Sequence, residues 1–167
     1  MTATESSNTP SNSMAAPTAV IDLLNSLLEA ELGSIFRFMG EGSPYLSRAT
    51  VEVRKPLQEM VLAQRRRSGE LADLIESLGT VPTPFVGIRR DEQYLAFLSL
   101  KFMLPKLVSE KKLEIERYDN ALAGGKKLPQ VPPEVPVLLN AHLAELRNEL
   151  TALERAAALV ATAKMTT

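Results

Sequence analysis

The chain has 167 residues, of which 45% are hydrophobic and 23% charged, and its formal net charge is −1 at pH 7. This composition is typical of one globular domain and excludes a largely disordered chain. It also argues against binding to nucleic acid or to an anionic membrane, both of which require a basic surface. Because there is no cysteine and one histidine, thiolate metal sites, cysteine nucleophiles and sites with two histidines from one chain are excluded.

The N-terminal residues 1–17 are rich in Ser, Thr, Asn, Ala and Pro and have no apolar periodicity, which predicts a disordered tail. They lack the basic and then apolar order of a secretory signal. The most apolar run, residues 94–108, is too short to span a bilayer and is interrupted by Lys101, Pro105 and Lys106. We therefore expect a cytoplasmic protein without a transmembrane span.

Residues 18–164 are predicted to form one domain of four long helices, since Gly and Pro lie almost only between segments with three-four apolar spacing. The predicted helices cover residues 18–39, 47–78, 91–124 and 137–163. Pro56 and Pro105 lie inside two of these helices, so we expect a kink or a late start at Pro56 and a kink at Pro105.

Each predicted helix has one apolar stripe, and four such helices bury their stripes against one another in an all-α four-helix bundle. The connection after Gly79 is long enough to run the length of the bundle, whereas the proline-rich connection at 126–136 is stiff and extended. The expected topology therefore has one long crossover between the second and third helices. No nucleotide-binding, hydrolase or metalloprotease motif occurs in the sequence.

Polar residues interrupt the apolar stripe of every predicted helix at about mid-length. They are Glu31 in the first helix, Gln64 and Arg67 in the second, Lys111 in the third, and His142 at the edge of the stripe in the fourth. Because burial of such groups is costly unless they meet partners, one shared internal cluster is the favoured interpretation. The alternative is that Arg67 and Lys111 extend to the surface. In the cluster, we expect Glu31 within salt-bridge distance of Arg67 or Lys111.

Two glutamates of the fourth helix, Glu145 and Glu149, are predicted to face away from its apolar stripe. On such a face, pairing with Arg147 or Arg155 is favoured over a surface cation site.

A crossover bundle with a polar layer at mid-height resembles the ferritin-like superfamily, including its bacterioferritin and rubrerythrin types. The segment Leu28-Glu-Ala-Glu-Leu-Gly-Ser-Ile35 resembles the first-helix motif of that family, with Glu31 at the position of a metal ligand. The stretches 64–82 and 142–153 are similar in pattern to the family's second and fourth helices. The resemblance implies a di-metal site built from one carboxylate on each of two helices and a Glu-x-x-His motif on each of the other two.

The sequence departs from this ligand pattern at most positions. The first Glu-x-x-His motif is replaced by Gln64-Arg-Arg-Arg67 and the second by Leu139-Asn-Ala-His142. The carboxylate of the third helix falls on Lys111, or on Glu110 if the register shifts by one residue. Fixed cations at these positions repel metal ions and attract carboxylates. The departures therefore imply a protein-only charged cluster in place of the metal centre.

The favoured function is a non-catalytic structural or binding module without a cofactor. We expect it to self-associate, as a dimer, and the apolar run at 94–108 is a candidate contact for a protein partner. The alternative is a metal-binding oxidase or iron-handling protein in which iron or manganese is held by Glu31, Gln64, Glu110 and His142.

Overall fold

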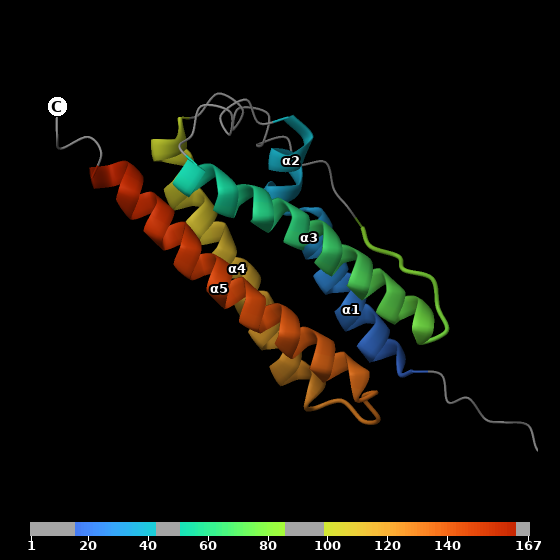
Figure 1. The fold of residues 1–167 in the computed structure, drawn as a ribbon. Coiled ribbons are helices and arrows are strands. Elements are labelled where there is room, and N and C mark those ends of the chain that lie inside the picture. The colour runs from blue at the N-terminus through green and yellow to red at the C-terminus, as the bar shows by residue number, and fades with distance from the viewer. Residues whose placement is uncertain (1–15, 43–50, 86–98, 163–167) are drawn as a thin grey trace, which may run out of the picture.

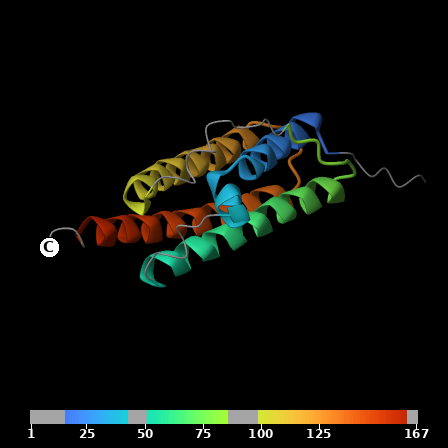
Figure 2. The same ribbon diagram turned by 90° about the horizontal axis from the view of Figure 1, so that it is seen from above.

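The computed structural model describes residues 16–42, 51–85 and 99–162, and all regular secondary structure in these ranges is helical. The helices are α1 (Thr18–Leu32), α2 (Ile35–Gly42), α3 (Val51–Ser77), α4 (Leu100–Gly125) and α5 (Glu134–Thr162). The prediction of an all-α bundle is confirmed: α1, α3, α4 and α5 run along a common direction and pack against one another (Figures 1 and 2). Among the described helices, none combines the length and apolar character needed to cross a membrane.

Two apolar clusters fill the bundle, one toward each end. The first contains the beginnings of α1 and α5 and the ends of α3 and α4. The second contains residues of α2, which follows α1, together with the beginnings of α3 and α4 and the end of α5. Consequently α3 and α4 run parallel to each other and antiparallel to α1 and α5 (Figure 1). The connection between α3 and α4 includes residues 86–98, which lie outside the described ranges.

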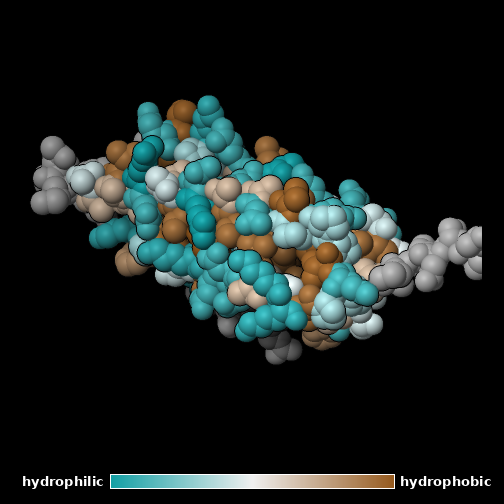
Figure 3. Space-filling model, turned by 90° about the horizontal axis from the view of Figure 1, so that it is seen from below, coloured by the Kyte–Doolittle hydropathy of each residue, from teal (hydrophilic) through white to brown (hydrophobic). Residues whose placement is uncertain are grey.

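The apolar stripes face inward, as amphipathic helices require. The most completely buried apolar side chains include Leu24, Leu57, Leu71, Leu107 and Leu146. On the face shown in Figure 3, hydrophilic side chains surround smaller hydrophobic areas.

The predicted continuous helix over residues 18–39 is wrong, because the chain breaks at Gly33 and Ser34. The Gly33 N–H still donates to the carbonyl of Glu29 (2.9 Å), but the Ser34 N–H turns to the carbonyl of Glu31 (3.2 Å) and ends α1. Gly and Ser are both weaker helix formers than Ala or Leu, so the break occurs where helical propensity is low. The apolar spacing continues across it into α2, which is why periodicity alone predicts one helix.

The other boundaries differ by a few residues or lie outside the described ranges. α5 begins at Glu134 rather than at residue 137, because Pro136 sits in the first turn, where its missing N–H has no helical partner to lose. α3 contains Pro56 and α4 contains Pro105. The predicted starts at residues 47 and 91 lie outside the described residues, and so do residues 1–15 of the tail predicted over residues 1–17.

The inward face of α4 is rotated relative to the stripe that the apolar spacing predicts, which passes through Leu104, Val108, Ile115, Tyr118 and Leu122. Val108, Ile115 and Leu122 are only partly buried, while Leu107 and Ala121 lie in the interior. This rotation brings further polar side chains of α4 into the bundle, between its two apolar clusters.

Candidate functional site

A layer of buried polar and charged side chains separates the two apolar clusters at mid-height of the bundle. Each of the four main helices contributes to it, and Ser34 enters from the break between α1 and α2. We call this group the charged layer. Its members are Glu31, Ser34, Gln64, Arg67, Ser68, Lys111, Glu114, Tyr118, His142 and Glu149.

Arg67 of α3 is fully buried and links three helices through its guanidinium. Its Nε donates to Glu31 Oε1 on α1 (3.0 Å), and its Nη1 donates to Glu149 Oε1 (2.8 Å) and Glu145 Oε2 (3.0 Å), both on α5. The planar guanidinium can satisfy carboxylates on two sides at once, which an ammonium group cannot do with the same geometry. Arg67 is therefore the point at which α1, α3 and α5 are joined.

Lys111 of α4 is the second buried cation. Its Nζ donates to Glu114 Oε2 on the same helix and to Glu149 Oε2 on α5, both at 2.7 Å. The Nζ also lies 3.9 Å from the centre of the Phe36 ring, a cation–π contact. Glu149 thus bridges the two cations, because one of its oxygens contacts Arg67 and the other contacts Lys111.

A chain of hydrogen bonds leads from the interior to the surface. The Tyr118 hydroxyl donates to Glu31 Oε1 (2.9 Å) and lies 3.2 Å from His142 Nδ1. On the other side of the ring, His142 Nε2 is 2.6 Å from Glu70 Oε2. The Glu70 side chain is 35% exposed, whereas that of Glu31 is 1% exposed. The chain therefore connects a buried carboxyl to a carboxylate at the protein surface, with groups that can each give and accept a proton.

Gln64 holds the backbone of Glu31, and Ser34 holds the carboxylate of Glu114. The Gln64 amide donates to the backbone carbonyl of Glu31 and to Ser68 Oγ, and so connects α3 to α1. Ser34 Oγ donates to Glu114 Oε1 (2.6 Å), a contact that the helix break makes possible. These bonds hold Glu31 and Glu114 from sides that the cations do not reach.

The layer contains more carboxylates than cations. Glu31, Glu114 and Glu149 are buried, whereas Arg67 and Lys111 are the two buried cations of the described chain. Burial raises the pKa of Glu31 to about 7, despite the opposing effect of Arg67. Protonation of Glu31 removes one negative charge from a layer that has three buried carboxyl groups and two buried cationic side chains.

The neighbouring titratable groups stay in fixed states around Glu31. Burial disfavours the charged guanidinium of Arg67, but the carboxylates of Glu31 and Glu149 outweigh it and raise the Arg67 pKa. Burial, together with the nearby Glu31, raises the pKa of Tyr118, which keeps it a neutral hydrogen-bond donor. Burial lowers the pKa of His142 although Glu70 opposes this shift. Burial tends to raise the pKa of Glu70, but hydrogen bonds with His142 and Arg66 outweigh this effect and lower the pKa.

The structure brings together the five side chains that interrupt the predicted apolar stripes. Glu31, Gln64, Arg67, Lys111 and His142 are all buried at this level of the bundle. Glu31 is paired with Arg67, and His142 reaches Glu31 through Tyr118. Lys111 faces the interior.

Glu110, the alternative to Lys111 as the inward-facing position of the third predicted helix, is only partly buried and is not a member of the charged layer. The expectation that Glu149 faces away from the apolar stripe is wrong, since it is buried between Arg67 and Lys111. Glu145 is partly buried and contacts Arg66 and Arg67 rather than a residue of its own helix. Both corrections follow from the rotation of α5. The apolar spacing predicts a stripe through Leu146, Leu150 and Leu153, whereas the structure buries Glu149 and leaves Leu150 only partly buried.

Glu114 is the buried carboxylate that the sequence reasoning missed. It lies three residues after Lys111 and four before Tyr118, so helical spacing alone puts all three on one face. That spacing is the feature of the sequence from which the burial of Glu114 could have been predicted. It was hidden because Ile115, the adjacent apolar residue, fits the stripe equally well.

The charged layer does not fit the di-metal site that the family resemblance implies. Both oxygens of Glu114 and both of Glu149 already accept hydrogen bonds from Ser34, Arg67 or Lys111. Of the oxygens of the three buried carboxylates, only Glu31 Oε2 lacks a hydrogen-bond partner within the described residues. Nor do the described residues contain a group of three or more His, Asp or Glu side chains arranged to hold a metal ion.

Comparisons with protein-family models, with curated proteins and with solved structures find no match for this chain.

Removal of Arg67 is expected to be strongly destabilising. In Arg67→Met, Glu31 and Glu149 stay buried without their shared cation, which should lower the free energy of unfolding by about 3–5 kcal/mol. The measurement is urea unfolding at neutral pH followed by circular dichroism. Arg66→Met is the matched control, because Arg66 is exposed and its ion pairs should contribute at most about 1 kcal/mol. Equal effects of the two substitutions would contradict the central role of Arg67.

The raised pKa of Glu31 predicts a defined pH dependence. Below about pH 4.5 the carboxyl is protonated in both the folded and the unfolded state. As the pH rises toward 7, the unfolded state releases this proton while the folded state retains it. The free energy of unfolding therefore decreases by about 3 kcal/mol over this range. The stability of the wild type relative to Glu31→Gln should therefore fall between pH 4.5 and 8. Urea unfolding of both proteins across this range measures it, and a relative stability that rises with pH would show an ionised Glu31 instead.

Proposed function

We propose that this chain is a ferritin-like helical bundle that has lost its di-metal centre and acts as a non-catalytic structural or binding module. The observation that carries the proposal is the pair of fully buried cations, Arg67 and Lys111, at mid-height among the carboxylates of the bundle. A metal centre at that level would need those carboxylates for itself.

The directions of the helices support the ferritin-like part of the proposal. α3 and α4 are parallel, as two helices joined by one long crossover would be. One-crossover topology distinguishes ferritin-like bundles from simple up-down bundles with short loops.

The positions of the buried side chains support it further. Ferritin-like di-metal sites use a carboxylate from each of two helices, and Glu31 of α1 is a buried carboxylate of this kind. On α4 the position expected for the other carboxylate is occupied by Lys111, and the buried carboxylate Glu114 lies three residues further on. The other two helices would each supply a Glu-x-x-His motif. On α3 the corresponding pair is Gln64 and Arg67, and on α5 it is Leu139 and His142. Glu31 and His142 therefore keep the residue type of a ligand, whereas both glutamates of the two motifs are replaced. Cations stand at Arg67 and Lys111 instead.

Electrostatics favour the loss of metal binding over its retention. A divalent ion beside Arg67 and Lys111 would be repelled by two fixed charges in a medium of low dielectric constant. It would also have to displace hydrogen bonds of 2.7–3.0 Å from the buried carboxylates. Arg67 and Lys111 therefore supply the positive charge that the metals would have supplied.

The alternative of a metal-binding oxidase or iron-handling protein receives less support from the geometry. Of the ligand set Glu31, Gln64, Glu110 and His142, Glu110 is not in the charged layer, and both ring nitrogens of His142 face protein partners. The test below keeps this alternative as an explicit outcome.

Self-association belongs to the same proposal. Phe102, near the start of α4, is 65% exposed, which is unusual for a large aromatic side chain and is compatible with a contact between subunits or with a protein partner. Residues 94–98 of the predicted partner contact lie outside the described ranges.

Metal-binding experiments test the proposed function directly. The wild type should bind neither iron nor manganese in stoichiometric amounts. Gln64→Glu with Arg67→His rebuilds one Glu-x-x-His motif but leaves Lys111, so its affinity should stay weak. The addition of Lys111→Met releases an oxygen of Glu114 and an oxygen of Glu149, and should strengthen the binding of Mn²⁺ by more than tenfold relative to the double variant.

Equilibrium dialysis against Mn²⁺ and Fe²⁺, followed by elemental analysis, measures this series. Gln64→Glu with Lys111→Met is the control, since it retains Arg67. Binding of two metal ions by the wild type would overturn the proposed function and favour the enzyme alternative.

A further inference from the structure

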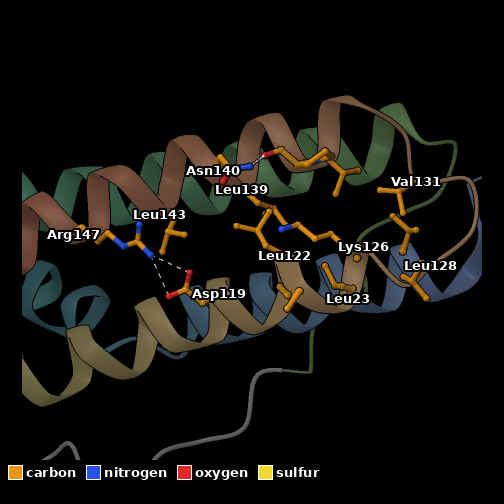
Figure 4. Close-up of a pocket in the computed structure, with 16 residues that line it drawn as sticks. Leu23, Asp119, Leu122, Lys126, Leu128, Val131, Leu139, Asn140, Leu143 and Arg147 are labelled. Carbon is orange, nitrogen blue, oxygen red and sulfur yellow. Dashed lines mark hydrogen bonds and ion pairs between the residues drawn. The ribbon is translucent and has the colours of Figure 1, made fainter.

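A second site lies away from the charged layer, at the end of the bundle where α4 turns into α5. It is a pocket of about 420 Å³ between α1, α4, α5 and the connection that joins the last two helices (Figure 4). It shares no residue with the charged layer, so an inference about it does not depend on the proposed function. Its volume falls in the range of about 300–1,000 Å³ that is typical of small-molecule sites.

The walls of the pocket are mainly apolar. Leu139 and Leu143 of α5 are buried and lie at its inner side, and Leu23, Leu128 and Val131 close it from α1 and from the connection. An apolar chain placed along these residues would remove hydrocarbon surface from water on both partners, which is worth about 0.8 kcal/mol for each buried CH₂ group.

The polar groups of the pocket have a net positive charge. Arg147 pairs with Asp119 at 3.1 Å through Nη2, and this pair closes one end of the pocket in Figure 4. The Lys126 side chain lies along the pocket with its nitrogen directed toward its middle. Lys126 forms no ion pair within the described residues, so one unit of positive charge remains after Asp119 and Arg147 balance each other.

We propose that this pocket binds an apolar monocarboxylate of the fatty-acid type. Its carboxylate would lie beside Lys126 and accept hydrogen bonds from that ammonium group and from Arg147. Its hydrocarbon chain would extend over Leu139 toward Leu128 and Val131. The Asn140 amide nitrogen donates one of its two N–H groups to the Pro136 carbonyl (2.7 Å), so the two cations supply most of the recognition of the carboxylate.

Calorimetric titration with ligands of matched chain length tests the proposal. The wild type should bind decanoate saturably, and more tightly than decanol or decylamine, which share its chain but are neutral or positively charged. Butyrate keeps the carboxylate and lacks most of the chain, so it should bind more than a hundredfold more weakly than decanoate.

Two lysine variants locate the binding site. Lys126→Ala should weaken decanoate binding about fivefold, as expected for one partly exposed ion pair, and should leave decanol binding unchanged. Lys127→Ala is the matched control, because Lys127 is also exposed and does not line the pocket. Both variants alter exposed side chains, and circular dichroism verifies that they fold.

Three results would overturn the proposal. The first is the absence of saturable decanoate binding by the wild type. The second is decanol binding as tight as that of decanoate, which would indicate a neutral apolar ligand. The third is equal weakening by Lys126→Ala and Lys127→Ala, which would indicate a general effect of surface charge.

Discussion

The buried guanidinium of Arg67 is the interaction on which the rest of the bundle depends. It joins α1, α3 and α5 directly, and through Glu149 it is connected to Lys111 on α4. A buried ion pair is seldom more stabilising than well-packed apolar side chains of the same volume. Its value here is geometric, since a slide of α3 by one turn, about 5.4 Å, would separate Arg67 from both Glu31 and Glu149. The charged layer thus fixes the register of four helices that apolar packing alone would hold less specifically.

Much of this architecture can be predicted from the sequence, because it follows from local periodicity. Gln64 and Arg67 share a helical face with Leu57 and Leu71, so their burial follows from the spacing alone. The same spacing predicts Glu31 as a partner of Arg67, but it does not predict Glu149. On α5 either Leu150 or Glu149 fits the spacing of the buried stripe. Hydrophobicity favours Leu150, so Glu149 is predicted to be exposed.

The missing information is the position of cations on other helices. Burial of Glu149 is unfavourable by itself and becomes acceptable only beside Arg67 and Lys111, which are far away in the sequence. The break at Gly33 and Ser34 has a similar origin. The break leaves the apolar periodicity intact. It allows a hydrogen bond from Ser34 to Glu114, which lies 80 positions further along the chain. Pairings of this kind are set by tertiary structure and not by local pattern.

The division of the interior into two apolar clusters has a consequence for how the molecule fluctuates. Charged groups are hydrated readily when water reaches them, so the charged layer is a natural limit for partial opening from either end. Cooperative units of unfolding should therefore follow the two clusters rather than individual helices. The end that contains the α4–α5 connection and the apolar pocket can then open and close around a small molecule, while the opposite end keeps its packing.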